Sequence, residues 1–209
     1  MNEPDSAVRQ VLRVLGGMIP ALLTCAVPSV LVYLDVAVFK MECDELGIVE
    51  LGQSVMLFAI VILMALAVRR RADLRGGLVL ACAFFLDMLL REQDQIFELW
   101  LPHGAWTVPV ALVTVAAFAY AFLRRESVWA FIGHVRENRH FSLFALGFFA
   151  VVGYSRIFGI KDIWRIAVGM DDFRVAKHVA EEGVELFGYT ILLYWAIWYF
   201  HDLRKEASR

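Results

Sequence analysis

Long apolar runs, separated by short charged connections, occupy most of the chain. A membrane core of about 30 Å requires about 20 helical residues, because each residue rises about 1.5 Å. Six runs reach this length, near residues 14–39, 46–68, 76–98, 104–123, 141–160 and 180–200. The pattern predicts an all-α, polytopic membrane protein, a six-transmembrane-helix bundle forming a single integral membrane domain over residues 1–209.

Basic residues gather in the connections on one side of these runs. That side carries Arg9, Arg13, Arg69, Arg70, Arg71, Arg75, Arg124, Arg125, Arg136, Arg139, Arg204, Lys205 and Arg209. The opposite connections contain Glu42, Asp44 and Glu45, then Asp94 and Glu98, and then a stretch of mixed charge from Lys161 to Lys177. Because loops rich in arginine and lysine stay in the cytoplasm, we expect both termini inside a bacterial-type inner membrane and an acidic outer face.

Two connections mix aromatic and aliphatic residues with polar ones. They cover residues 127–134 (SVWAFIGH), between the fourth and fifth runs, and residues 162–170 (DIWRIAVGM), between the fifth and sixth. Amphipathic segments of this kind favour short helices that lie in the membrane interface. We therefore expect one such helix in each of these connections.

The first apolar run has some features of a lipoprotein signal. It follows Arg9 and Arg13 and contains the sequence LLTC at residues 22–25. The run nevertheless continues to Phe39, whereas the apolar part of a signal peptide is short and ends near its cleavage site. An uncleaved first transmembrane helix is the prediction.

Composition narrows the possible functions. Hydrophobic residues make up 60% of the chain, above the roughly 45–50% of soluble domains, and the mean hydropathy is +0.64. The net charge of −2 provides no basic field for nucleic acid, which we exclude as a partner. The three cysteines have no CxxC spacing, so neither a disulfide framework nor a thiolate metal site is indicated.

Polar residues recur at one depth in four of the six runs. Each lies about 15 residues from the cytoplasmic end, hence roughly 22 Å into the membrane, and they are Gln53, Arg91, Arg156 and Glu185. Glu50 and Glu182 lie about one turn further out, and Asp87 about one turn deeper. Because an ionised side chain at such depths costs about 2.5–3.5 kcal/mol, we expect these groups to face the bundle interior and to share one site.

The chemistry of this layer suits a phosphate-bearing lipid headgroup. Arg91 and Arg156 can grip phosphate in a bidentate manner, with Gln53, Tyr154 and Tyr189 as further substrate-binding groups. The predicted catalytic residues are Glu182, Glu185 and Asp94, which as carboxylates can act as a general base or hold a divalent cation such as Mg²⁺ or Ca²⁺. No HExxH, GxSxG, Walker or GxGxxG motif occurs, so zinc protease, serine hydrolase and nucleotide-binding chemistry are not supported.

Two short segments add to this interpretation. Residues 153–156 (GYSR) and 181–185 (EEGVE) resemble fragments of the Ser-Arg and Glu-x-x-x-Glu motifs of the bacterial undecaprenyl-pyrophosphate phosphatases. The likeness covers under a dozen residues and lacks the proline and second serine of the Ser-Arg motif. It implies that such residues can serve a lipid-phosphate site.

Three functions follow from the layer. The first is a protein that binds, or also hydrolyses or transfers, the anionic headgroup of a lipid or other amphiphile at the outer leaflet. The second is a proton- or cation-coupled transporter or channel, in which Asp87 is the coupling carboxylate, tuned by Arg91. The third is an accessory or sensory subunit in which Asp87–Arg91 and Arg156–Glu185 are structural ion pairs. Membrane lipids are the expected partners, beside a second copy of the chain or another membrane subunit.

Overall fold

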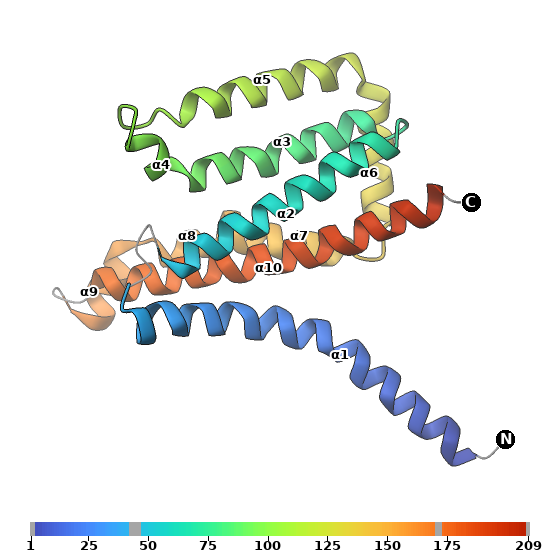
Figure 1. Cartoon of the computed structure of the whole chain (residues 1–209), viewed down its shortest axis with the longest axis horizontal. Helices are drawn as coiled ribbons and strands as arrows, with labels where there is room; N and C mark the ends of the chain where they lie inside the picture. The colour runs from blue at the N-terminus through green and yellow to red at the C-terminus, as the bar shows by residue number, and fades with distance from the viewer. Residues whose placement is uncertain (1–2, 42–46, 170–172, 208–209) are drawn as a thin grey trace.

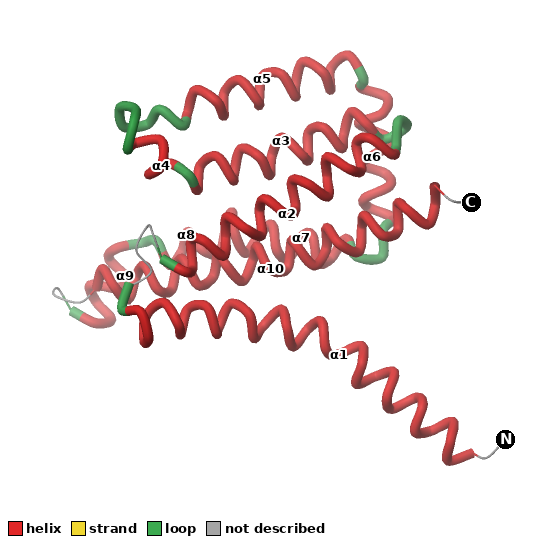
Figure 2. The backbone as a smooth tube through the Cα atoms, viewed as in Figure 1, coloured by secondary structure: helices red, strands yellow, loops and turns green. Residues whose placement is uncertain are grey.

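The computed structural model describes residues 3–41, 47–169 and 173–207, and these parts are helical with no strand (Figures 1 and 2). The acidic residues 42, 44 and 45 lie outside the described residues. The helices are α1 (Glu3–Tyr33), η1 (Leu34–Phe39), α2 (Ile48–Arg70), α3 (Arg75–Glu92), α4 (Asp94–Glu98), α5 (Thr107–Leu123), α6 (Arg125–Glu137), α7 (Phe141–Phe149), η2 (Ala150–Tyr154), α8 (Ser155–Phe158), α9 (Lys161–Val168) and α10 (Phe173–Ala207). The segments η1 and η2 are π-helical.

The six apolar runs all fall on helices. The third run is broken at Gln93, where α3 gives way to the short α4, and the fifth is a composite of α7, η2 and α8. The two amphipathic connections also form helices, α6 and α9. The expectation of an all-helical chain with short helices in these connections is therefore confirmed.

Within the described residues, three segments are long and apolar enough to cross a membrane: Val8–Phe39, Ile48–Arg70 and Phe141–Phe158. A fourth qualifies if α5 and α6, bent by 98° relative to each other, are taken as one span. The predicted count of six is therefore not confirmed by length and composition. The physical reason is clear for α5, which alone has only 17 residues, and for α3, whose 18 residues include Arg75, Asp87, Arg91 and Glu92.

Helix α2 occupies the centre of the bundle. It packs against α3 on one side and α10 on the other, while α5 covers α3, and α7 and α1 pack against α10 (Figure 1). The core between these helices includes Leu57, Ile60 and Phe85, which are buried, and Trp195, which stacks on Tyr199. The N-terminal half of α1 diverges from the bundle (Figure 1).

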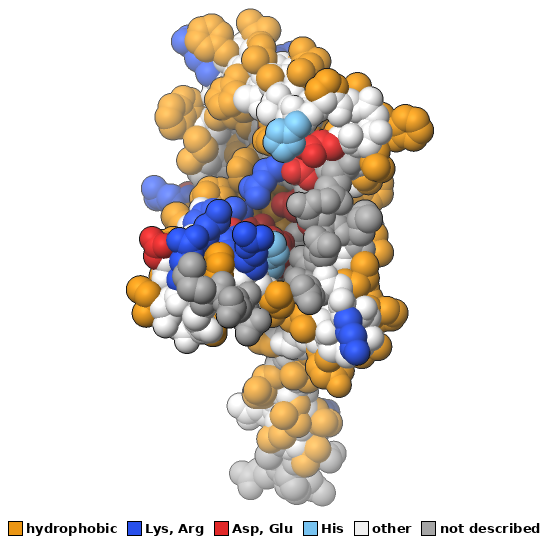
Figure 3. Space-filling view, turned by 90° about the vertical axis from the view of Figure 1, so that its left-hand side faces the viewer, with side chains coloured by type: hydrophobic (Ala, Val, Ile, Leu, Met, Phe, Trp, Pro, Cys, Tyr) orange, Lys and Arg blue, Asp and Glu red, His pale blue; other side chains and the backbone are white. Residues whose placement is uncertain are grey.

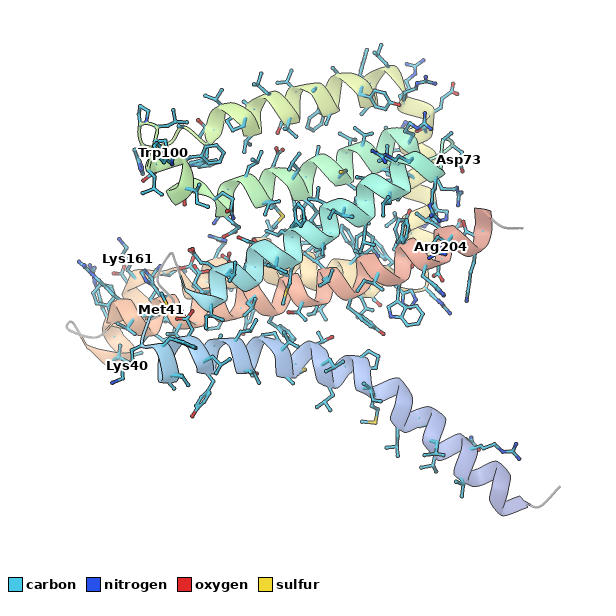
Figure 4. All side chains as sticks on the ribbon, viewed as in Figure 1. Lys40, Met41, Asp73, Trp100, Lys161 and Arg204 are labelled. Atoms are coloured by element: carbon cyan, nitrogen blue, oxygen red, sulfur yellow. The ribbon has the colours of Figure 1, made fainter. Side chains whose placement is uncertain are left out.

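The connections alternate between the two ends of the bundle. Lys40, Met41, Trp100 and Lys161 lie at one end, and Asp73 and Arg204 lie at the other (Figure 4). We call these the Trp100 end and the Arg204 end. The alternation means that successive long helices run in opposite directions.

Small residues allow α7 and α10 to cross closely. A Cβ atom on Gly188 would lie 2.5 Å from Cγ2 of Val151 and 3.2 Å from the carbonyl oxygen of Gly147. Glycine pairs of this kind let helix backbones approach each other in membranes. The crossing fixes η2 and α8 beside α10, and so sets the position of Arg156.

Candidate functional site

A polar cavity of about 180 Å³ lies at the Trp100 end, between α2, α3, α4, α8 and α10. Its lining consists of Glu50, Arg91, Glu92, Asp94, Arg156, Lys177, His178, Glu181, Glu182 and Glu185. Figure 3 looks onto this end and shows carboxylates recessed among arginine, lysine and histidine side chains. Pockets for drug-sized molecules span roughly 300–1,000 Å³, so this cavity has room for a headgroup rather than a whole lipid.

Arg156, at the mouth of the cavity, forms an ion pair with Glu185, at the floor of the cavity. The Arg156 guanidinium donates a hydrogen bond to Glu185, and its Nη1 lies 3.5 Å from Oε1 of Glu181. The Glu185 side chain is only 3% exposed, whereas that of Arg156 is 41% exposed. Glu181 also accepts a 2.6 Å hydrogen bond from Lys177, one turn earlier on α10. One side of the Arg156 guanidinium therefore stays open.

The π-helical segment η2 directs Arg156 into the cavity. It ends at Tyr154, and the buried Ser155 then donates a 2.5 Å hydrogen bond to the carbonyl of Val151. A π turn shifts later side chains around the helix axis, and such turns are frequent at functional sites. The same geometry leaves Tyr154 55% exposed, with its ring against Phe158. The structure thus places Tyr154, a predicted binding residue, outside the cavity.

Two neutral side chains form hydrogen bonds to carboxylates at the floor of the cavity. The fully buried Gln53 donates from Nε2 to Oε2 of Glu182 at 3.0 Å and to the Glu182 carbonyl at 3.2 Å. The buried Tyr189 hydroxyl donates to Oε1 of Glu92 at 2.9 Å. These bonds hold α2, α3 and α10 together at one depth. Gln53 and Tyr189 therefore lie behind the cavity wall rather than on it.

Sequence reasoning missed Glu92. The predicted site residues in this part of the chain are Asp87, Arg91 and Asp94, and Glu92 is not among them. Its signal was available in the depth count, because Glu92 lies next to Arg91 in the same layer. The predicted Glu50, Arg91, Asp94, Arg156, Glu182 and Glu185 are all brought together in the cavity.

Asp87 contacts α5 rather than the cavity. Its Oδ2 accepts a 2.6 Å hydrogen bond from the Thr114 hydroxyl of α5. Its other carboxylate oxygen is buried and has no hydrogen-bond partner among the described atoms. Asp87 thus joins α3 to α5 and does not line the cavity.

The cavity carries more negative than positive charge. Six carboxylates face two arginines and one lysine, which leaves a net charge of −3 when all are ionised and His178 is neutral. The acids do not converge on a metal site: the described residues contain no group of three or more histidine, cysteine, aspartate or glutamate side chains that could hold a metal ion. Glu182 and Glu185, two of the candidate metal ligands, are instead bonded to Gln53 and Arg156.

The core below the cavity is apolar. Beyond Tyr189, the buried residues on α2, α3 and α10 include Leu57, Ile60, Phe85 and Leu192. Trp195, one turn beyond Leu192, packs against Phe85 and Phe144. The cavity is therefore closed toward the Arg204 end.

A second, wider cavity of about 510 Å³ lies at the Arg204 end, lined by His134, Glu137, Asn138, Arg139, Asp202, Lys205 and Glu206. Its polar groups largely satisfy one another. Glu206 accepts hydrogen bonds from Arg71 at 2.5 Å and from His134 at 3.0 Å. Burial alone would raise the pKa of the Glu206 carboxyl, but these two bonds outweigh it and lower that pKa below its ordinary value. This cluster joins the α2–α3 connection to α6 and α10.

The Trp100-end cavity combines the half-exposed guanidinium of Arg156 with more carboxylates than cationic side chains. A phosphate can bind the guanidinium, and a positively charged group can bind the carboxylates. No protein-family model, no curated protein and no solved structure matches this chain. The geometry of the cavity therefore carries the case for function.

Proposed function

We propose that the chain is a bacterial-type inner-membrane protein with six spans and both termini in the cytoplasm. In this proposal the Trp100-end cavity binds a phospholipid headgroup at the outer leaflet. The single observation that carries the proposal is the half-exposed Arg156 guanidinium, anchored on the buried Glu185 at the mouth of a headgroup-sized cavity.

The arrangement of the helices supports six spans. Helices α3 and α10 lie alongside α2, α5 lies alongside α3, and the connections fall alternately at the two ends (Figures 1 and 4). Two of the charges that weaken α3 as a lipid-exposed span have partners within the protein, where Asp87 meets Thr114 and Glu92 meets Tyr189. Buried partners of this kind are how membrane helices accommodate charged residues.

The lining supports a lipid ligand. Arg156 and Arg91 both reach the cavity, and guanidinium groups bind phosphate oxygens with two parallel hydrogen bonds. The exposed residues around Arg156, which include Val152, Ile157 and Ile160, offer an apolar surface along which acyl chains can lie. Glu182 and Glu185 are already hydrogen-bonded, so binding is supported more directly than general-base catalysis.

The alternatives fit less well. A transporter or channel needs a polar route between the two ends, and the apolar layer around Phe85, Leu192 and Trp195 interrupts it. An accessory subunit needs only ion pairs that lock the packing. It does not need an open cavity with ten polar lining residues.

The test is the amount of phospholipid that remains bound after purification in mild detergent. The variant Arg156→Gln with Glu185→Gln removes the guanidinium without leaving a buried carboxylate unpaired, so we expect a folded protein that retains far less lipid than the wild type. The matched control is Arg139→Gln with Asp202→Asn, which removes a 3.1 Å ion pair at the Arg204 end and should retain lipid normally. Equal lipid content in all three proteins would rule the proposal out.

A further inference from the structure

We infer that the bound headgroup carries a primary ammonium group beside its phosphate, as a phosphatidylethanolamine-type lipid does. The inference rests on the proposed function and names its ligand class. It is carried by the excess of carboxylates in the Trp100-end cavity and by the kinds of residue absent from its described lining.

The charge balance favours a cationic group in the ligand. With all six acids ionised and His178 neutral, the lining has a net charge of −3 before any ligand enters, and an anionic headgroup alone would make it more negative. Arg156 is already shared between Glu185 and Glu181, and Lys177 is bonded to Glu181. A headgroup that brings one positive charge with its phosphate adds no net charge to the cavity and places that positive charge beside the carboxylates.

The floor has free acceptor capacity. Among the bonds described above, Glu92 accepts one from the neutral Tyr189 hydroxyl, and Glu182 accepts from the neutral Gln53 amide. An ionised carboxylate has about four acceptor positions. A primary ammonium donates three hydrogen bonds, so it can bridge these two acids while the phosphate lies toward Arg156.

The lining distinguishes a primary ammonium from other cations. Quaternary ammonium groups such as choline are bound by aromatic cages, and no described residue that lines the cavity is phenylalanine, tyrosine or tryptophan. A divalent metal ion needs several converging ligands, and the described acids and histidines form no such group. A ligand with an ammonium group next to a phosphate needs hydrogen-bond acceptors for the ammonium and an arginine beside them for the phosphate, and this lining provides both.

The experiment measures binding of lipids with identical dilauroyl chains to the delipidated full-length protein by native mass spectrometry. The headgroups compared are phosphoethanolamine, phosphoglycerol and phosphocholine. Because a hydrogen bond to a charged group is strong, we expect the ethanolamine lipid to bind about tenfold more tightly than the other two. If the glycerol or choline lipid binds the wild type as tightly as the ethanolamine lipid does, the inference is overturned but the proposed function stands. If none of the three lipids binds, both are overturned.

Two further variants and a soluble competitor test which residues contact the ammonium group and whether the ligand is a lipid or a free headgroup. Glu92→Gln keeps an acceptor for Tyr189 but removes the charge, so the preference for ethanolamine over glycerol should fall toward one. Glu126→Gln, an exposed acid on α6, is the matched control and should keep the full preference; an unchanged preference in Glu92→Gln overturns the placement of the ammonium. Water-soluble phosphoethanolamine should compete weakly, and competition as strong as that of the lipid would overturn the lipid as its source.

Discussion

Arg156 and Glu185 show what one pair of side chains contributes to this bundle. The Glu185 side chain is almost fully buried, while Arg156 reaches the surface. Removing one member of a buried pair leaves an uncompensated charge, whereas removing both together is much milder. The pair therefore contributes to stability, and in the proposed function it would also bind the ligand; mutation can separate the two contributions.

The first prediction is non-additivity at this pair. Arg156→Gln alone should lower the free energy of unfolding, by less than the roughly 3–5 kcal/mol of a fully buried pair, because Arg156 is 41% exposed. Adding Glu185→Gln should restore most of that loss. The free energy of unfolding in detergent is measured for the wild type, the two single variants and the double variant. Strictly additive losses would contradict the pairing.

The sequence was most informative for residues at regular helical positions. Counting a constant rise per residue assigned Arg91, Arg156 and Glu185 to one layer, and the structure gathers them in one cavity. The count could not place Tyr154, because the π turn of η2 changes the direction of side chains near it. Nor could it show that Asp87 bonds to Thr114 of α5, because helix periodicity does not say which neighbour a face meets.

At the scale of helices, the crossing of α7 and α10 positions the site. Gly147 and Gly188 let the two backbones approach, and η2 continues from that contact to Arg156. The sequence predicted both helices but not this contact. Glycines occur in many of the apolar runs, and only the packing shows which of them lie at a crossing.

The second prediction concerns this crossing. Gly188→Ala should destabilise the protein by about 1–3 kcal/mol, because its Cβ would lie 2.5 Å from the stiff, buried Val151. It should also reduce lipid retention, since α8 would shift away from Glu185. Gly183→Ala is the matched control on the same helix: its Cβ would meet Val32 at an ordinary 3.6 Å. The measurements are the thermal unfolding and the lipid content of the two variants. Equal stability and equal lipid content in both would contradict this role of the crossing.

The third prediction concerns the contacts of Glu206 at the Arg204 end. The folded-state pKa of Glu206 is lowered, so its contribution to stability is complete above its ordinary pKa of about 4.3 and is lost as pH falls through the lowered value. Glu206→Gln should therefore be less stable than the wild type at neutral pH, and the difference should shrink below about pH 4. Thermal unfolding from pH 7 to pH 3 measures this, with Glu126→Gln as a control that should follow the wild type. A gap that widens on acidification would contradict the assignment.

At the scale of the whole molecule, the account depends on which end faces outward. The excess of basic residues was the only guide to orientation in the sequence, and the structure adds that the connections alternate between two ends. Among the described residues, hydropathy counts neither α3 nor α10 as a span, because both carry charged and polar residues. Some of these bond to each other inside the bundle, as Glu92 of α3 and Tyr189 of α10 do. That pairing is visible only after folding.

The fourth prediction is the accessibility of single cysteines in a background without Cys25, Cys43 and Cys82. A membrane-impermeant maleimide added to intact cells should label Trp100→Cys and Lys161→Cys, and should reach Asp73→Cys and Arg204→Cys only after lysis. All four positions are exposed. Labelling of Asp73→Cys together with Trp100→Cys in intact cells would contradict the six-span topology.

The most direct test of the central claim is a density map, at side-chain resolution, of the protein in a lipid bilayer disc that contains ethanolamine and glycerol phospholipids. The account predicts headgroup density in the Trp100-end cavity, with its phosphate against Arg156 and its amine end toward Glu92 and Glu182. A cavity filled only by its own side chains, with Glu92 and Glu182 bonded to Arg91 and no density beyond them, would contradict it.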